Sequence, residues 1–162
     1  MARKNKTRQK IRVSEHITLE EATKSVTAKG KGIDNTPDEK TLEVMKQTAE
    51  ILFEPLRRFW GVPIYVSSMF RSPELNEAIG GSKTSDHMKG RAIDLDAHVY
   101  GHISNRQIFE YLRDHVDYDQ LIWEFGNADE PDWVHVSYRG DENRRQKLMA
   151  YKSGGKTKYK FI

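Results

Sequence analysis

A long run of apolar residues at helical spacing dominates the first half of the chain. These residues recur at alternating intervals of three and four, at Leu42, Met45, Ala49, Leu52, Leu56 and Phe59. Such spacing places one apolar stripe along an amphipathic helix. Pro55 lies inside the stripe, and a proline within a helix removes a backbone hydrogen bond, so we expect a kink there. The stripe predicts a long helix that packs its apolar face against another layer.

After residue 60 the pattern changes to short runs typical of strands: IYVSS (64–68), RAIDLD (91–96), DQLIWEF (119–125) and WVHVSY (133–138). Between them, Ser72 and Ser104 are predicted N-caps of two helices, and Thr18 and Glu21 predict a capping box at an early helix. Because predicted helices come early in the chain and predicted strands come late, we expect an α+β fold, with helices packed on a small central, mostly antiparallel sheet.

Charge is distributed unevenly along the 162 residues. Residues 1–12 carry six Lys or Arg and no acid, and residues 151–162 carry four Lys and no acid, so residues 13–150 hold 17 basic against 24 acidic residues. We therefore divide the chain into a basic, flexible N-terminal arm (1–12), a single domain (13–150) and a basic C-terminal tail (151–162). The two ends are either solvated or attract a polyanion such as nucleic acid or an anionic cell envelope.

Several classes of protein are excluded by composition. The chain has no cysteine, so disulfides and thiolate metal ligands are ruled out. No apolar stretch approaches the ~20 residues that span a bilayer. The basic start MARKNKTRQKIR is not followed by an apolar core, so we expect no signal peptide and synthesis in the cytoplasm.

Two histidines and an aspartate are predicted to meet on one face of the sheet. Alternate residues of a strand point to opposite sides, so in WVHVSY His135 faces away from the valines that fill the core. Asp94 lies between two apolar residues in the same way, and Gly90 allows a turn that brings His87 towards it. Two imidazoles and one carboxylate form the ligand set of a catalytic zinc site, which keeps its fourth position for water.

The joint pattern S-x-H-x-x-G-x-A-x-D, which begins at Ser85, is followed after about forty residues by W-V-H-V-S. It resembles the zinc D-alanyl-D-alanine carboxypeptidases and endolysin peptidases of the M15 family, in particular their small, phage-associated branch. Further stretches, such as FEPLRRFWGVPIYVSSMFRSPELN and IWEFGNADEPDWVHVSY, extend the likeness over roughly residues 13–148. The resemblance implies a zinc peptidase domain at residues 13–150, with zinc held by His87, Asp94 and His135 on the open face of the sheet.

The resemblance also implies an acidic general base three residues before the second ligand histidine, which here is Asp132 in DWVH. Three residues along a regular strand would place Asp132 on the face opposite His135, so a bend at Pro131 is required. Glu124 of IWEFG is the alternative base; otherwise it is a strand-end carboxylate that supports the site. We favour Asp132.

Three residues are predicted to bind substrate because they match family positions. Arg71 aligns with an arginine that contacts the substrate, and a guanidinium binds a carboxylate through two parallel hydrogen bonds. A structural ion pair is the alternative for Arg71. Ser82 and Ser85 match family serines, which contact either the substrate or their own loop.

The predicted function is hydrolysis of the peptide stem of bacterial peptidoglycan by metal-activated water and an acidic base. The cleaved bond is either a terminal D-Ala-D-Ala bond or one within the stem, such as L-Ala-D-Glu. The expected lack of a signal peptide and the basic ends favour an endolysin that reaches the cell wall during phage lysis. We expect a monomer whose basic ends contact an anionic wall, and no nucleic-acid partner, because the acidic body repels phosphates. The alternative is a catalytically silent wall-binding or phage structural module of the same fold.

Overall fold

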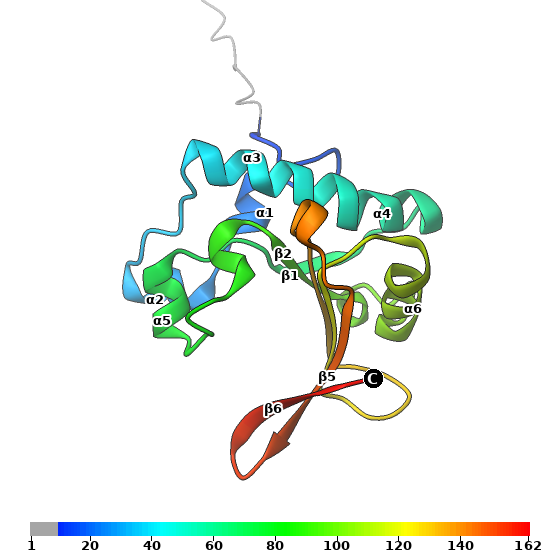
Figure 1. Cartoon of the computed structure of the whole chain (residues 1–162). Coiled ribbons are helices and arrows are strands. Elements are labelled where there is room, and N and C mark those ends of the chain that lie inside the picture. The colour runs from blue at the N-terminus through cyan, green and yellow to red at the C-terminus, as the bar shows by residue number, and fades with distance from the viewer. Residues whose placement is uncertain (1–9) are drawn as a thin grey trace, which may run out of the picture.

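Helices precede most of the strands in the computed structural model, which describes residues 10–162 (Figure 1). The helices are α1 (Leu19–Thr23), α2 (Val26–Lys31), α3 (Glu39–Thr48), α4 (Glu54–Trp60), α5 (Pro73–Ala78) and α6 (Asn105–His115). The strands are β1 (Tyr65–Ser68), β2 (Ala92–Asp96), β3 (Gln120–Glu124), β4 (Trp133–Ser137), β5 (Gln146–Ser153) and β6 (Lys156–Phe161). The first nine residues of the predicted N-terminal arm lie outside the described residues. No helix of residues 10–162 is long and apolar enough to cross a bilayer.

The predicted amphipathic helix forms as α3 and α4, joined by a π-helical turn at Ala49–Phe53. Pro55 lies in the first turn of α4, where its missing N–H costs least, and the π turn just before it accommodates the interruption. Leu52 and Leu56 are completely buried, as the stripe predicts. Phe59 is the exception: it is 63% exposed, because it lies in the last turn of α4, beyond the core.

Six strands form one sheet in the order β1-β2-β4-β3-β5-β6. Neighbouring strands are antiparallel except β3 and β5, which are parallel. The α+β architecture and the mostly antiparallel sheet are therefore as predicted. The parallel pair arises because β4 pairs with one side of β3, and the chain then returns to place β5 on the other side.

Helices α3, α4 and α6 pack on one face of the sheet. Ile93 and Leu95 of β2 and Val134 and Val136 of β4 belong to the same buried cluster as residues of α3, α4 and α6. Because strand residues alternate between faces, the side chains between these apolar ones point to the opposite side. The sequence alternation thus places a core on one face and a set of polar residues on the other.

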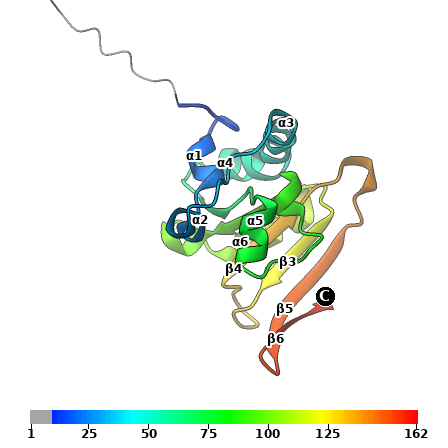
Figure 2. The ribbon, with the colours of Figure 1, turned by 90° about the vertical axis from the view of Figure 1, so that its left-hand side faces the viewer.

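Residues 151–161 extend the sheet, whereas we expected a basic tail outside the domain. They form most of a hairpin between β5 and β6, which projects from the body of the molecule (Figures 1 and 2). The turn is made by Gly154 and Gly155, both with positive φ (59° and 72°), which suits a two-residue hairpin turn. Lysines alternate with threonine, tyrosine and phenylalanine in β6. This alternation is typical of a strand, although the segment as a whole is basic.

Candidate metal centre

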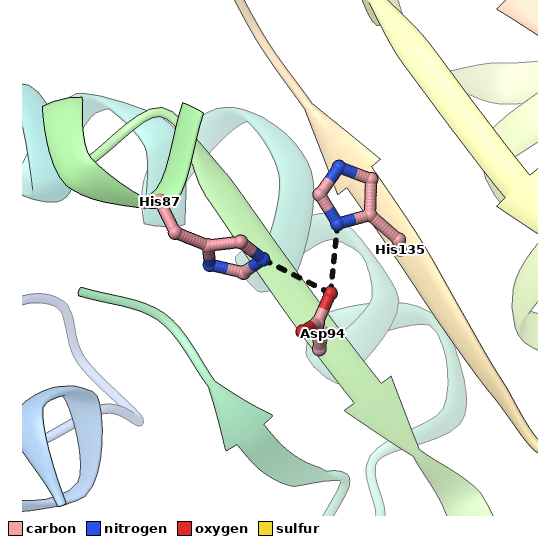
Figure 3. Close-up of side chains that lie close together, drawn as sticks. All are labelled: His87, Asp94 and His135. Atoms are coloured by element: carbon pink, nitrogen blue, oxygen red, sulfur yellow. Dashed lines mark hydrogen bonds and ion pairs between the residues drawn. The ribbon is translucent and has the colours of Figure 1, made fainter. Parts of the chain in front are cut away.

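His87, Asp94 and His135 meet on the open face of the sheet. Asp94 of β2 lies directly across from His135 of β4 in antiparallel register, and His87 comes from a short 3₁₀ helix, Asp86–Lys89, that precedes β2. Their potential ligand atoms all lie within 4.8 Å of one another. Asp94 Oδ1 is 3.2 Å from His87 Nε2 and 2.8 Å from His135 Nδ1 (Figure 3). The structure thus brings together the three residues predicted as ligands.

Gly90 makes the turn that directs His87 towards Asp94. Its φ is +69°, in the left-handed region that favours glycine. A β-carbon at this position would lie 2.7 Å from Met45 Cγ and 3.0 Å from the Thr41 carbonyl oxygen, both in α3. The backbone therefore passes too close to α3 for any side chain at residue 90.

The hydrogen bonds of His87 determine what its ring presents to the centre. Nδ1 lies 2.7 Å from the Met69 carbonyl oxygen, which only accepts, so Nδ1 carries a proton and donates it there. Burial lowers the pKa of His87, which favours the neutral ring. A neutral ring with its proton on Nδ1 presents a lone pair on Nε2, directed at the Asp94 carboxylate. Two lone pairs facing each other call for a cation between them.

Asp94 is ionised although it is buried. Burial opposes the charge, but the hydrogen bond from His135 Nδ1, at 2.8 Å, helps to hold the pKa of its carboxyl well below the usual range. Its second oxygen, Oδ2, accepts a hydrogen bond of 3.0 Å from Arg71 Nη2, and Arg71 Nε donates to Ser68 Oγ at 3.0 Å. Two imidazole nitrogens and a carboxylate are a donor set that suits a divalent transition metal.

The three residues lie at the wall of an open cavity of about 580 Å³. The cavity is also lined by all three residues predicted to bind substrate, Arg71, Ser82 and Ser85. Arg71 makes the ion pair with Asp94 that we considered as an alternative, and its contact with a substrate stays a prediction. The same holds for the two serines, which also make contacts within their own loop: Ser82 Oγ accepts from the Thr84 N–H at 3.3 Å, and the Ser85 N–H donates to the Ser82 carbonyl oxygen at 3.0 Å.

Of the two candidate bases, Glu124 and not Asp132 lines this cavity together with His135. In the register, Glu124 pairs with Trp133, which lies on the same face of β4 as His135. Burial raises the pKa of Glu124 to about 7. Asp132 has an exposed side chain, and its backbone N–H donates to the Glu124 carbonyl oxygen at 2.9 Å. The bend expected at Pro131 does not turn Asp132 into the cavity, because this hydrogen bond continues the pairing of β3 with β4.

Sequence reasoning missed the part of the cavity that the C-terminal hairpin forms. Leu148 and Lys152 of β5 and Thr157 and Tyr159 of β6 line it. Burial raises the pKa of Tyr159, and the carboxylates of Glu124 and Asp94 raise it further. The two adjacent glycines followed by alternating residues were the signal that predicts this hairpin.

An open cavity with buried, convergent ionisable side chains, carried on the strands of a sheet, is typical of an enzyme active site. The sequence profile of the family described as Peptidase M15 matches residues 15–137. This match covers about three quarters of the chain and includes His87, Asp94, Glu124 and His135. The protein therefore belongs to the M15 peptidases, a family of hydrolases that act on peptide bonds. A search of curated proteins finds no match to the chain.

Proposed function

We propose that the protein is a zinc-dependent peptidase that hydrolyses the peptide stem of bacterial peptidoglycan. The observation that carries this proposal is the convergence of His87, Asp94 and His135 in a cavity that also contains the buried acid Glu124. Membership of the M15 family supports peptide-bond hydrolysis.

The side chains that converge fit zinc. Catalytic zinc sites use three protein ligands from histidine and acidic residues, whereas structural sites use four. Within residues 10–162, the potential ligand group at the cavity consists of His87, Asp94 and His135. The Met69 carbonyl orients the His87 ring, and Arg71 orients the Asp94 carboxylate, which are the outer contacts that ligands of a metal require.

When bound by His87, Asp94 and His135, zinc would supply Lewis-acid chemistry, which would polarise the scissile carbonyl and lower the pKa of water towards ~7. Glu124 accepts the proton of the attacking water and delivers it to the leaving amine. A carboxyl whose pKa lies near 7 is suited to both tasks, since it gains and loses a proton readily at neutral pH. Arg71 holds Asp94 in place and, as the family resemblance implies, contacts a carboxylate of the substrate.

The proposed substrate is the stem peptide, cut either at its terminal D-Ala-D-Ala bond or within it, as an endolysin-like enzyme does. We propose that the protein acts as a monomer at the cell wall, in the manner of the phage-associated branch of the family. We propose that the positive charge of residues 1–12 and of the C-terminal hairpin attracts the protein to an anionic wall.

The test is incubation of zinc-loaded protein with defined muropeptides, followed by mass spectrometry of the products. Release of a single alanine identifies a carboxypeptidase, and a divided stem identifies an endopeptidase. Removal of zinc by a chelator should abolish the reaction, and added zinc should restore it. His135→Ala should lose both zinc and turnover.

A catalytically silent wall-binding module is the competing function, and the same experiment separates the two. If zinc-loaded protein binds insoluble peptidoglycan but releases no product from any muropeptide, the enzymatic proposal fails. The buried position of Glu124 favours an enzyme, because burying an unpaired carboxyl costs free energy that a binding surface does not require.

A further inference from the structure

The β5–β6 hairpin lies beyond the residues matched by the family profile, yet it borders the active site. β5 pairs with β3 so that Ala150 is opposite Glu124, and β6 pairs with β5 so that Tyr159 is opposite Ala150. Directly paired residues of neighbouring strands share a face of the sheet. Glu124, Ala150 and Tyr159 therefore form one row, which leads from the proposed base to the hairpin.

Lys152 and Thr157 form the next row of the hairpin on the same face. Lys152 Nζ donates to Thr157 Oγ1 at 2.8 Å and lies 5.2 Å from the centre of the Phe125 ring. Within residues 10–162, no carboxylate pairs with Lys152. Its ammonium group therefore has two donor protons for a further acceptor.

The other cations at the cavity are already neutralised by carboxylates of the protein. The pairs are Arg71 with Asp94, Arg139 with Asp86, and Arg144 with Asp119. Within residues 10–162, Lys152 is thus the cavity-lining cation that has no carboxylate partner.

Protection of an exposed sheet edge explains the remaining lysines of the hairpin but not Lys152. Lysines on an edge strand prevent pairing with other chains, and Lys158 lies on the edge strand β6. Lys158 is opposite Tyr151, so it points to the face away from the cavity. Lys152 lies on the inner strand β5 and on the cavity side.

We propose that the hairpin is a substrate-binding wall of the cavity, in which Lys152 and Tyr159 bind a carboxylate of the substrate. This inference rests on the proposed peptidase function. An ammonium group and a phenol hydroxyl are both donors, and a carboxylate accepts from both. Stem peptides carry free carboxylates, so the wall selects a stem with an ionised carboxylate close to the cleaved bond.

The experiment compares two synthetic stem peptides that differ in one group, a free carboxylate or a carboxamide beside the cleaved bond. Zinc-loaded wild-type protein should prefer the carboxylate peptide. Lys152→Met should lower kcat/KM for that peptide by about tenfold, the loss expected for one charge-assisted hydrogen bond, and leave the carboxamide peptide unchanged. Tyr159→Phe should act in the same direction.

Two variants control for charge and for folding. Lys158→Met removes the same charge from the opposite face of the hairpin and should change neither rate. Lys152→Arg keeps the cation and should retain the preference. The idea is wrong if Lys152→Met affects both peptides equally, affects neither, or is matched by Lys158→Met.

Failure of the proposed function gives a different result from failure of the wall. If wild-type protein hydrolyses neither peptide, calorimetric binding of both peptides to zinc-loaded protein replaces the kinetics. Weaker binding of the carboxamide, lost in Lys152→Met, then supports the wall without the peptidase. Equal binding of both peptides by wild type and variant overturns it.

Discussion

Replacing Glu124 by glutamine should abolish most of the activity and leave the metal in place. The amide has nearly the shape of the carboxyl but cannot accept a proton, so the change removes one chemical step from a preserved cavity. Loss of a general base costs about 10²–10⁴-fold in kcat, which corresponds to about 3–5 kcal/mol of transition-state stabilisation. The upper part of this range is expected, because Glu124 is only 7% exposed and little bulk water can replace it as a base.

The measurement is single-turnover hydrolysis of a defined stem peptide, with zinc content determined on the same samples. Asp132→Asn is the matched control, since Asp132 is an exposed acid one residue before β4. It should retain activity within about twofold, as surface substitutions usually do. If Glu124→Gln stays active and Asp132→Asn does not, the base is the residue that the family resemblance implied, and the reasoning from the cavity is wrong.

Two further predictions concern the support of the site. Arg71→Lys should weaken zinc binding by about 10–100-fold in a competitive chelator titration, because it loses the paired contacts to Asp94 and Ser68; unchanged affinity would show that Arg71 serves the substrate alone. Gly90→Ala should lower the free energy of unfolding in urea by more than Gly101→Ala. Both have a left-handed φ, which costs about 1–2 kcal/mol, but only residue 90 lies against α3; equal losses would contradict this.

The convergence of His87, Asp94 and His135 could be predicted from the sequence because it depends largely on local alternation. In β2 and β4 the apolar residues are separated by single polar ones, so the face of Asp94 and of His135 follows from the strand period alone. The position of His87 followed from the glycine at residue 90. The sequence did not predict that β2 and β4 are neighbours, or the register that places Asp94 opposite His135.

The family resemblance and the cavity favour different candidates for the general base, Asp132 and Glu124, and the reason lies in strand pairing. Strand alternation already placed Asp132 on the face opposite His135, and only the family pattern favoured it. Glu124 lies on the same face of the sheet as His135. This can be seen only once β3 is paired with β4 and Glu124 is placed opposite Trp133. The alternation of faces within one strand can be predicted from the sequence, whereas the strand with which it pairs cannot.

The hairpin was hidden by its composition. Four lysines among the last twelve residues suggested a tail that is either solvated or attracted to a polyanion, yet the cavity-side residues of β6 are Thr157, Tyr159 and Phe161. Long, charged side chains on one face of an edge strand are compatible with a sheet. At this end of the chain, the alternation of residue types therefore predicts the structure better than the net charge does.

The register of the sheet fixes the core and the site together. A slip of one residue between β2 and β4 would turn Asp94 into the core and expose Ile93 and Leu95, so the buried apolar face locks the aspartate opposite His135. The pairing of β3 with β5 is fixed in the same way, because Ile122 of β3 lies opposite Leu148 of β5 and both are buried. Asp94, His135, the proposed base Glu124 and the side chains of the hairpin therefore occupy successive paired strands of one sheet, and a change of register in the hairpin would remove its side chains from the cavity.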